Sequence, residues 1–126
     1  MGLISGILGN ASTVDNDKIQ KELVDVLVPN ETVQAAFRVI RDLFVFTNKR
    51  MILVDKQGYT GKKVEYKSVP YKSIKYFSVE TAGRFDMDAE LKIWISNRPE
   101  PTISKTLKRG IDIVSLQKTL AYYVMG

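Results

Sequence analysis

Three acidic residues, Asp86, Asp88 and Glu90, alternate in the second half of the chain and are its most suggestive set for metal or acid–base chemistry. In an extended segment they would lie on one side, where their carboxylates could hold Ca²⁺ or Mg²⁺. The glycine and terminal glutamate of a calcium loop are missing, and no nucleophile or cofactor-binding loop adjoins them. A polar hairpin tip near Gly83-Arg84 explains the three residues more simply.

The sequence contains no histidine and no cysteine. Their absence removes the commonest general base and metal ligand, the thiolate nucleophile and every disulfide. We therefore predict a non-enzymatic protein without catalytic residues, metal or cofactor. A cysteine-free chain also suits the cytoplasm, which is the location we expect.

Basic and aromatic residues interleave in the middle of the chain, where Lys62-Lys63 stand near Tyr59 and Tyr66. Such a mixture occurs in surfaces that bind single-stranded nucleic acid, an anionic membrane or a protein, and also in solvated strand edges. No helix-turn-helix, RNA-recognition or OB-fold signature accompanies it, so we expect no nucleic acid partner. The candidate partner or anionic surface consists of Arg38, Arg41, Lys62, Lys63 and Lys67.

The net charge of +5 is distributed unevenly along the chain. Residues 1–31 contain two lysines and five acids, a net charge of −3, whereas the rest of the chain contains 17 basic and 9 acidic residues, a net charge of +8. This asymmetry can steer the basic part toward an acidic partner, or toward the acidic segment of another copy.

The length of 126 residues predicts a single domain, with a helical segment over 1–30, a β-barrel over 32–108 and a capping helix over 111–125. The apolar start, residues 1–9, is too short to span a bilayer, and we expect it to pack on the domain or on a neighbouring subunit rather than on a membrane. A first helix is predicted from Asp15 to Val28, ended by Pro29. The last helix should be capped by Asp112.

From Val33 onward the apolar period changes to two, which predicts strands. Two apolar runs flank the tetrad Thr47-Asn48-Lys49-Arg50 and predict a tight hairpin, in which Asn48 tolerates the left-handed backbone of the turn. About seven strands result, at Val33–Ile40, Leu43–Phe46, Met51–Val54, Val64–Lys67, Ile74–Glu80, Leu91–Ser96 and Thr102–Leu107. The fold class is therefore mainly β (α+β), an antiparallel sandwich or barrel capped by the C-terminal helix, with an N-terminal helix.

The two strands of this hairpin are apolar on both faces, which a half-solvated sheet does not require. Either a helix or another subunit must cover the second face; we favour another subunit, with the N-terminal helix as the alternative. Trp94 lies on the polar face of its strand, where it either anchors an interface or packs beneath a loop. The predicted oligomer interface comprises Phe44, Phe46, Met51, Leu53 and Trp94.

Four ordered motifs carry a family resemblance: Phe46-Thr47-Asn48-Lys49-Arg50, Val54-Asp55-Lys56-Gln57-Gly58, Gly61-Lys62-Lys63-Val64-Glu65-Tyr66 and Pro70-Tyr71-Lys72-Ser73-Ile74. In these motifs the chain resembles the bacterial pleckstrin-homology-like (PH-like) family, formerly a domain of unknown function. The resemblance implies a PH-like fold, assembly into a cyclic, ring-shaped homo-oligomer such as a pentamer, and a polar surface at the strand junctions that binds other proteins. The sequence itself sets neither the ring size nor the partner.

Eukaryotic domains of this architecture that bind inositol phosphates carry a basic cluster in the loop between their first two strands. Here the whole connection is Arg41-Asp42, which is too short to cradle a phosphate, so phosphoinositide binding is not carried over. We expect a non-enzymatic interaction module that forms a ring and binds a protein partner. The alternative is a peripheral binder of anionic membrane lipids.

Overall fold

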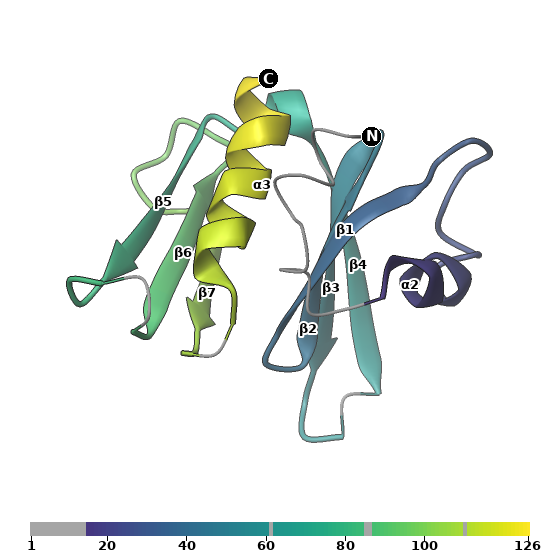
Figure 1. Cartoon of the computed structure of the whole chain (residues 1–126), viewed down its shortest axis with the longest axis horizontal. Coiled ribbons are helices and arrows are strands. Elements are labelled where there is room, and N and C mark those ends of the chain that lie inside the picture. The colour runs from purple at the N-terminus through teal and green to yellow at the C-terminus, as the bar shows by residue number, and fades with distance from the viewer. Residues whose placement is uncertain (1–14, 61, 85–86, 110) are drawn as a thin grey trace.

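The computed structural model describes residues 15–60, 62–84, 87–109 and 111–126. The expectation for residues 1–9 and the candidate Asp86 lie outside these residues. The described elements are α2 (Asn16–Glu22), β1 (Val33–Val39), β2 (Asp42–Thr47), β3 (Arg50–Gln57), β4 (Lys63–Pro70), the 3-10 turn η1 (Tyr71–Ser73), β5 (Tyr76–Thr81), β6 (Ala89–Trp94), β7 (Ile103–Leu107) and α3 (Ile113–Met125). This order confirms the predicted mainly β class, with an N-terminal and a C-terminal helix (Figure 1).

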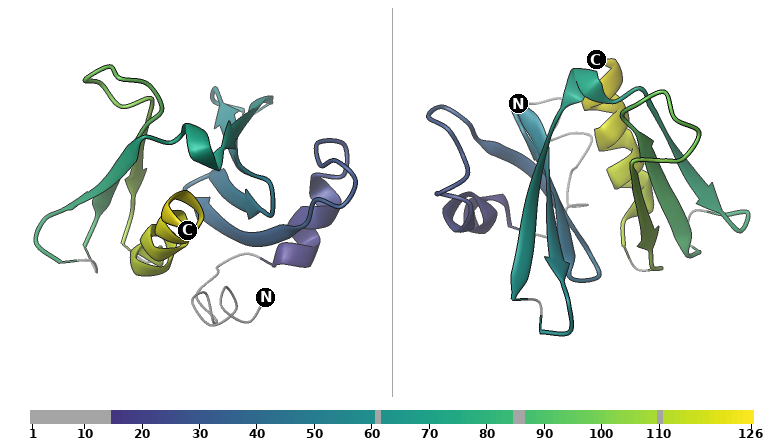
Figure 2. Two further views of the ribbon diagram at one scale, coloured as in Figure 1. Left: turned by 90° about the horizontal axis from the view of Figure 1, so that it is seen from above. Right: turned by 180° about the vertical axis from the view of Figure 1, so that it is seen from behind.

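The seven strands form two antiparallel sheets. Sheet A contains β1 to β4 in sequence order, and sheet B contains β5 to β7, also in sequence order. The two sheets splay apart, and α3 lies in the opening between them, as the views from the front and from above show (Figures 1 and 2). The predicted sandwich capped by a C-terminal helix is therefore confirmed.

The main core lies between the inner faces of the two sheets. Phe37 and Phe46 meet edge to face there, with ring centroids 6.1 Å apart. Helix α3 closes the opening because its apolar stripe faces this core, and Asp112 caps it as predicted by accepting a hydrogen bond from the Ser115 amide. The α3 side chains buried in this core are Ile113, Leu116 and Leu120.

A second, smaller core covers the outer face of sheet A. Ile19 and Leu23, from α2 and its C-cap, pack on Val45 and Ile52 of the central strands. The N-terminal helix, which was the alternative cover, therefore occupies this face within one chain, and sheet A is buried on both sides.

This arrangement corrects the predicted oligomer interface. Phe44, Phe46, Met51 and Leu53 all lie in the main core and are at most 1% exposed. The apolar character of both strand faces is explained by sheet B and α3 on one side and by α2 on the other. These four side chains consequently offer no surface to another copy.

The first helix is shorter than its pattern predicted. It begins after the N-cap Asp15, whose carboxylate accepts the Asp17 amide, and ends at Glu22 rather than at Val28. The following residues form turns, because the Val26 carbonyl and the Val28 amide bind side chains of the polar network described below rather than continuing the helix. Pro29 therefore follows the end of the helix by several residues.

The β2–β3 turn also differs from expectation. Asn48 does not take the left-handed backbone, since the described non-glycine residues with positive φ are Asn30 (68°) and Ile40 (60°). The Thr47 hydroxyl shapes the β2–β3 turn instead by accepting the amides of Lys49 and Arg50 at 3.0 Å each.

Ile40 has an unfavourable backbone conformation, with a φ of 60°. It is the first of the two residues between β1 and β2, a position where positive φ favours glycine or asparagine and penalises a β-branched side chain. It is also 60% exposed, so little burial within the described chain compensates the strain. Backbone strain of this kind costs about 1–3 kcal/mol.

Replacing Ile40 by Asn is expected to stabilise the protein by about 1 kcal/mol, because Asn adopts the left-handed region readily. Urea unfolding at neutral pH measures the change. Ile40→Val is the matched control, since it keeps the β-branch and should leave the stability unchanged; a fall in stability with Ile40→Asn would contradict the strain argument.

Candidate interaction surfaces

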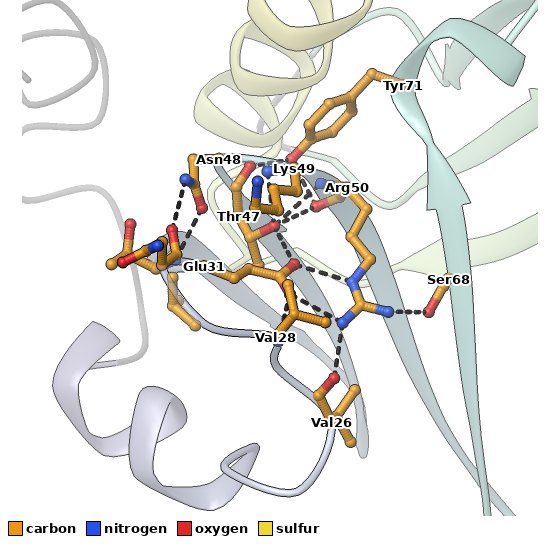
Figure 3. A network of polar contacts seen from close by, with 12 residues as sticks. Val26, Val28, Glu31, Thr47, Asn48, Lys49, Arg50, Ser68 and Tyr71 are labelled. Carbon is orange, nitrogen blue, oxygen red and sulfur yellow. Dashed lines mark hydrogen bonds and ion pairs between the residues drawn. The ribbon is translucent and has the colours of Figure 1, made fainter.

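A buried ion pair holds the segment after α2 against the β2–β3 hairpin (Figure 3). The Glu31 carboxylate is fully buried, and the Arg50 guanidinium donates to both of its oxygens at 2.9 Å. Arg50 also donates to the Val26 carbonyl at 2.7 Å and to the Ser68 hydroxyl at 2.8 Å. This bidentate geometry fixes direction as well as distance, so the segment 26–31 is tied to two strands at once.

The other residues of the predicted tetrad complete this network. The Thr47 hydroxyl donates to Glu31 at 2.6 Å. Asn48 accepts the Thr32 amide and donates to the Asn30 carbonyl. The Tyr71 hydroxyl lies 2.6 and 2.7 Å from the carbonyl oxygens of Thr47 and Arg50, within donating distance of either. The tetrad therefore has a structural role, because it binds the segment 26–32 to the β2–β3 turn. The Lys49 side chain remains exposed.

Several pKa values in this region depart from their ordinary range. The hydrogen bond from Arg50 is the main cause that lowers the pKa of Glu31 from 4.5 to about 2, and those from Thr47 and Val28 act in the same direction against burial. The same ion pair raises the pKa of Arg50. Burial raises the pKa of Tyr71, whose hydroxyl stays protonated as the donor.

At the other end of sheet A, Lys105 of β7 joins the two sheets. Its ammonium lies 3.1 Å from Asp42 and 3.1 Å from Asp55. Burial lowers the pKa of Lys105, but the hydrogen bonds to the two carboxylates outweigh it, so the pKa lies above its ordinary value. Asp42 also accepts the Lys56 amide at 2.9 Å, which holds the ends of β2 and β3 together.

Most of the predicted basic residues gather at this end. Arg38 and Arg41 flank the exposed Ile40 at the β1–β2 turn, and Lys62 and Lys63 lie at the β3–β4 turn, which projects from the same end of sheet A (Figure 1). All four are exposed. Lys67 lies further along β4 and is half-buried. The β1–β2 and β3–β4 turns with these four basic residues are called the hairpin tips below.

Trp94, the fifth residue of the predicted interface, lies on the outer face of sheet B. It is half-buried and stacks on Tyr76 of the neighbouring strand, with ring centroids 4.6 Å apart and an angle of 21°. Its indole N–H donates to the Pro99 carbonyl at 2.9 Å, so it does pack beneath its own loop. Tyr76 is nevertheless 52% exposed, and no helix in the described residues covers this face (Figures 1 and 2).

The acidic candidates are occupied by neighbours within the chain. Asp88 accepts the Arg109 amide at 2.7 Å, and Glu90 accepts the Ser104 hydroxyl at 2.8 Å. Across the part of the chain that the structure describes, no group of three acidic residues is arranged to hold a metal ion. The described helices include none that is long and apolar enough to cross a membrane.

Comparison with known proteins agrees with this fold. The family model of the bacterial PH domain matches residues 2–124. The chain belongs to the bacterial PH domain family. It is 58% identical to the uncharacterized protein YjqA of Bacillus subtilis over 99% of this chain and 100% of YjqA, and 30% identical to the uncharacterized protein YozO of the same organism over 82% of this chain and 88% of YozO.

Two solved bacterial PH domains are similar in structure. The pleckstrin homology domain from Shewanella amazonensis SB2B has 58% identity and a TM-score of 0.83, over 98% of this chain and 99% of that one. The DUF1696 family protein with a pleckstrin-homology domain from Shewanella loihica PV-4 has 57% identity and a TM-score of 0.74, over 90% and 96%. The predicted family and its description as a domain of unknown function are confirmed.

Two residues of the candidate surfaces are not assigned to a site by the sequence patterns. The sequence assigns Tyr76 to no site, although the two consecutive predicted strands that hold Tyr76 and Trp94 could suggest that the two rings meet. Ile40 ends the first predicted strand, on the face opposite its fully apolar one, and a sequence does not display the backbone angle of such a residue. Both contribute to the exposed surfaces described above.

Stability of this bacterial PH domain is expected to fall between pH 4.5 and pH 2. The pKa of Glu31 is lowered from 4.5 to about 2 in the folded state, so its contribution is complete above pH 4.5 and is lost as the pH falls toward 2. A shift of this size corresponds to about 3 kcal/mol in the free energy of unfolding. Urea unfolding across this pH range measures it.

Glu31→Gln should remove this acid-dependent loss and lower stability at neutral pH, because Arg50 then lacks its counter-charge. Glu22→Gln, on the exposed side of α2, is the matched control and should retain it. An unchanged acid slope in Glu31→Gln would show that other carboxylates carry the effect.

Proposed function

We propose that this protein is a non-enzymatic interaction module of the cytoplasm that assembles with copies of itself into a ring and binds a protein partner. The observation that carries the proposal is the uncovered outer face of sheet B, where Tyr76 and Trp94 present a stacked aromatic pair. Tryptophan and tyrosine are the residues most enriched among the energetically dominant contacts of protein interfaces.

The geometry of this face supports binding rather than catalysis. The Trp94 ring is fixed by its hydrogen bond to Pro99 and by the stacked Tyr76, so little side-chain entropy is lost when a partner covers it. Along the same face, Lys92 pairs with Glu80 at 2.9 Å and Glu90 accepts Ser104. A partner would therefore meet an aromatic pair at one end of the face and polar side chains along the rest of it, and interfaces commonly combine such aromatic and polar contacts.

Self-association is supported by the family resemblance and by the opposite net charges of the two parts of the chain. A ring requires a contact between two different surfaces of one molecule. The described chain offers surfaces that differ in charge and in position, and none of them is the apolar hairpin of β2 and β3.

The proposal predicts a particle several times the 14.3 kDa mass of one chain, measured by light scattering at tens of micromolar.

Tyr76→Ala with Trp94→Ala should weaken binding of the protein partner by about 30-fold, as expected for loss of about 2 kcal/mol at a central aromatic contact. The partner is obtained by affinity capture and then titrated as a purified protein.

Val114→Ser, on the exposed side of α3, is the matched control and should leave partner binding unchanged. A wild-type monomer at this concentration would exclude the ring. Equal partner affinity for the aromatic variant and the control would exclude the outer face of sheet B.

A second candidate, peripheral binding to anionic lipids, is favoured by the hairpin tips. The exposed Ile40 stands between Arg38 and Arg41, and an apolar side chain flanked by cations suits the boundary of an anionic bilayer. A bilayer would contact these tips rather than sheet B, so separate variants distinguish the two functions.

This candidate predicts co-sedimentation with phosphatidylserine vesicles that weakens as salt rises from about 0.1 M to about 1 M, since the Debye length then falls from about 10 Å to about 3 Å. Lys62→Glu with Lys63→Glu should reduce binding by at least about 30-fold, since each lysine removed costs about 1 kcal/mol and each added glutamate repels the anionic surface. Vesicles of phosphatidylcholine alone are the control, and binding that ignores salt and charge would contradict the electrostatic mechanism.

A further inference from the structure

The segment around α2 combines acidic charge with exposed apolar side chains. Val24 and Val28 are 69% and 48% exposed and line one groove together with Leu27. Glu22 and Asp25 are exposed beside them and form no ion pair within the described residues. We call the surface of Glu22, Val24, Asp25 and Val28 the acidic ridge; Lys21 also borders it.

The hairpin tips have the opposite charge and the same kind of apolar centre. Arg38, Arg41, Lys62 and Lys63 are exposed, and none is ion-paired among the described residues. Exposed apolar groups stand among them, since Ile40 is 60% exposed and Tyr59 is completely exposed.

No carboxylate of the described residues forms an ion pair with the cations of these tips, although the exposed Glu65 lies two residues from Lys63 on β4. Asp42 and Asp55, the carboxylates at the root of the two hairpins, are both bound by Lys105. The tips therefore present positive charge around apolar side chains, whereas the acidic ridge presents negative charge around apolar side chains.

The two surfaces lie on different sides of one molecule. Helix α2 stands beside the outer face of sheet A, while the tips project from one end of that sheet, in views from front and back (Figures 1 and 2). A single chain in this conformation does not bring its ridge onto its own tips. Because a two-fold contact through either surface alone would oppose like charges, the complementary arrangement joins the ridge of one copy to the tips of the next.

We infer that the acidic ridge of one copy docks on the hairpin tips of a second copy, with Val24 and Val28 packed against Ile40 and Tyr59. The contact is head-to-tail, so it leads to a closed ring when the rotation between copies closes. It also gives the strained Ile40 an apolar environment. The inference rests on the proposed self-association and names the surfaces that produce it.

Charge reversal tests the pairing. Glu22→Lys with Asp25→Lys, and separately Lys62→Glu with Lys63→Glu, should each raise the concentration needed for assembly at least 10-fold, measured by light scattering. The chain that carries all four substitutions should assemble again, because both surfaces have exchanged sign. All sites are exposed, and circular dichroism with urea unfolding verifies that each variant is folded.

Cysteine cross-linking tests the direction of the contact, since the chain has no cysteine of its own. Val28→Cys and Ile40→Cys should each stay uncross-linked alone and form a disulfide-linked dimer when the two variants are mixed and oxidised. Val114→Cys replaces Val28→Cys in the matched control and should give no such dimer with Ile40→Cys.

The outcomes separate the inference from the proposed function. Assembly that survives both charge reversals, or a mixture that does not cross-link, would overturn the ridge-to-tip contact while self-association stands. A wild-type monomer would overturn both. If the tips bind phosphatidylserine vesicles and the charge-reversed variants still assemble, the bilayer is their occupant and the inference is wrong.

Discussion

The buried pair of Glu31 and Arg50 is the interaction on which the arrangement of surfaces depends. A carboxylate removed from water must be fully satisfied, and here the guanidinium, the Thr47 hydroxyl and the Val28 amide do this together. The same guanidinium binds Val26 and Ser68, so the chain after α2 has one position relative to the hairpin. That position places α2 on sheet A and thereby decides which surfaces remain outside.

The two sheets differ in burial because α2 covers the outer face of sheet A alone. The central strands of sheet A are buried on both faces, whereas β6 alternates between buried and half-exposed residues, as a sheet with one solvated face does. Apolar character on both faces of a strand therefore indicated two covering layers, and both layers belong to the same chain. The surfaces proposed for other molecules are the outer face of sheet B, where the alternation is regular and Tyr76 and Trp94 stack, and the two hairpins that project beyond the core.

Local patterns in the sequence predicted the strands and the last helix well. They did not predict which segments distant in the chain contact one another. The strands followed from period-two alternation and the last helix from its stripe and Asp112, because both depend on residues close in the chain. The early end of α2 and the role of Asn48 depend on contacts with residues far away in the chain, such as those of Arg50 with Val26, 24 positions away, and of Asn48 with Asn30, 18 positions away. The family was predicted from the resemblance of four sequence motifs. The packing of α2 on the outer face of sheet A became evident only from the three-dimensional structure.

The strain at Ile40 links the hairpin tips to the acidic ridge. Strain of about 1–3 kcal/mol is considerable beside a typical domain stability of 5–15 kcal/mol, and the described chain returns little of it because the side chain is mostly exposed. An apolar contact with another molecule would bury that side chain and offset the strain. The exposed cations around it would favour an anionic surface, and the acidic ridge at the end of α2 has both acidic residues and exposed valines. Since ridge and tips are separate surfaces of opposite sign, a contact between the ridge of one copy and the tips of another would have a direction, and directional contacts build rings or filaments rather than closed pairs.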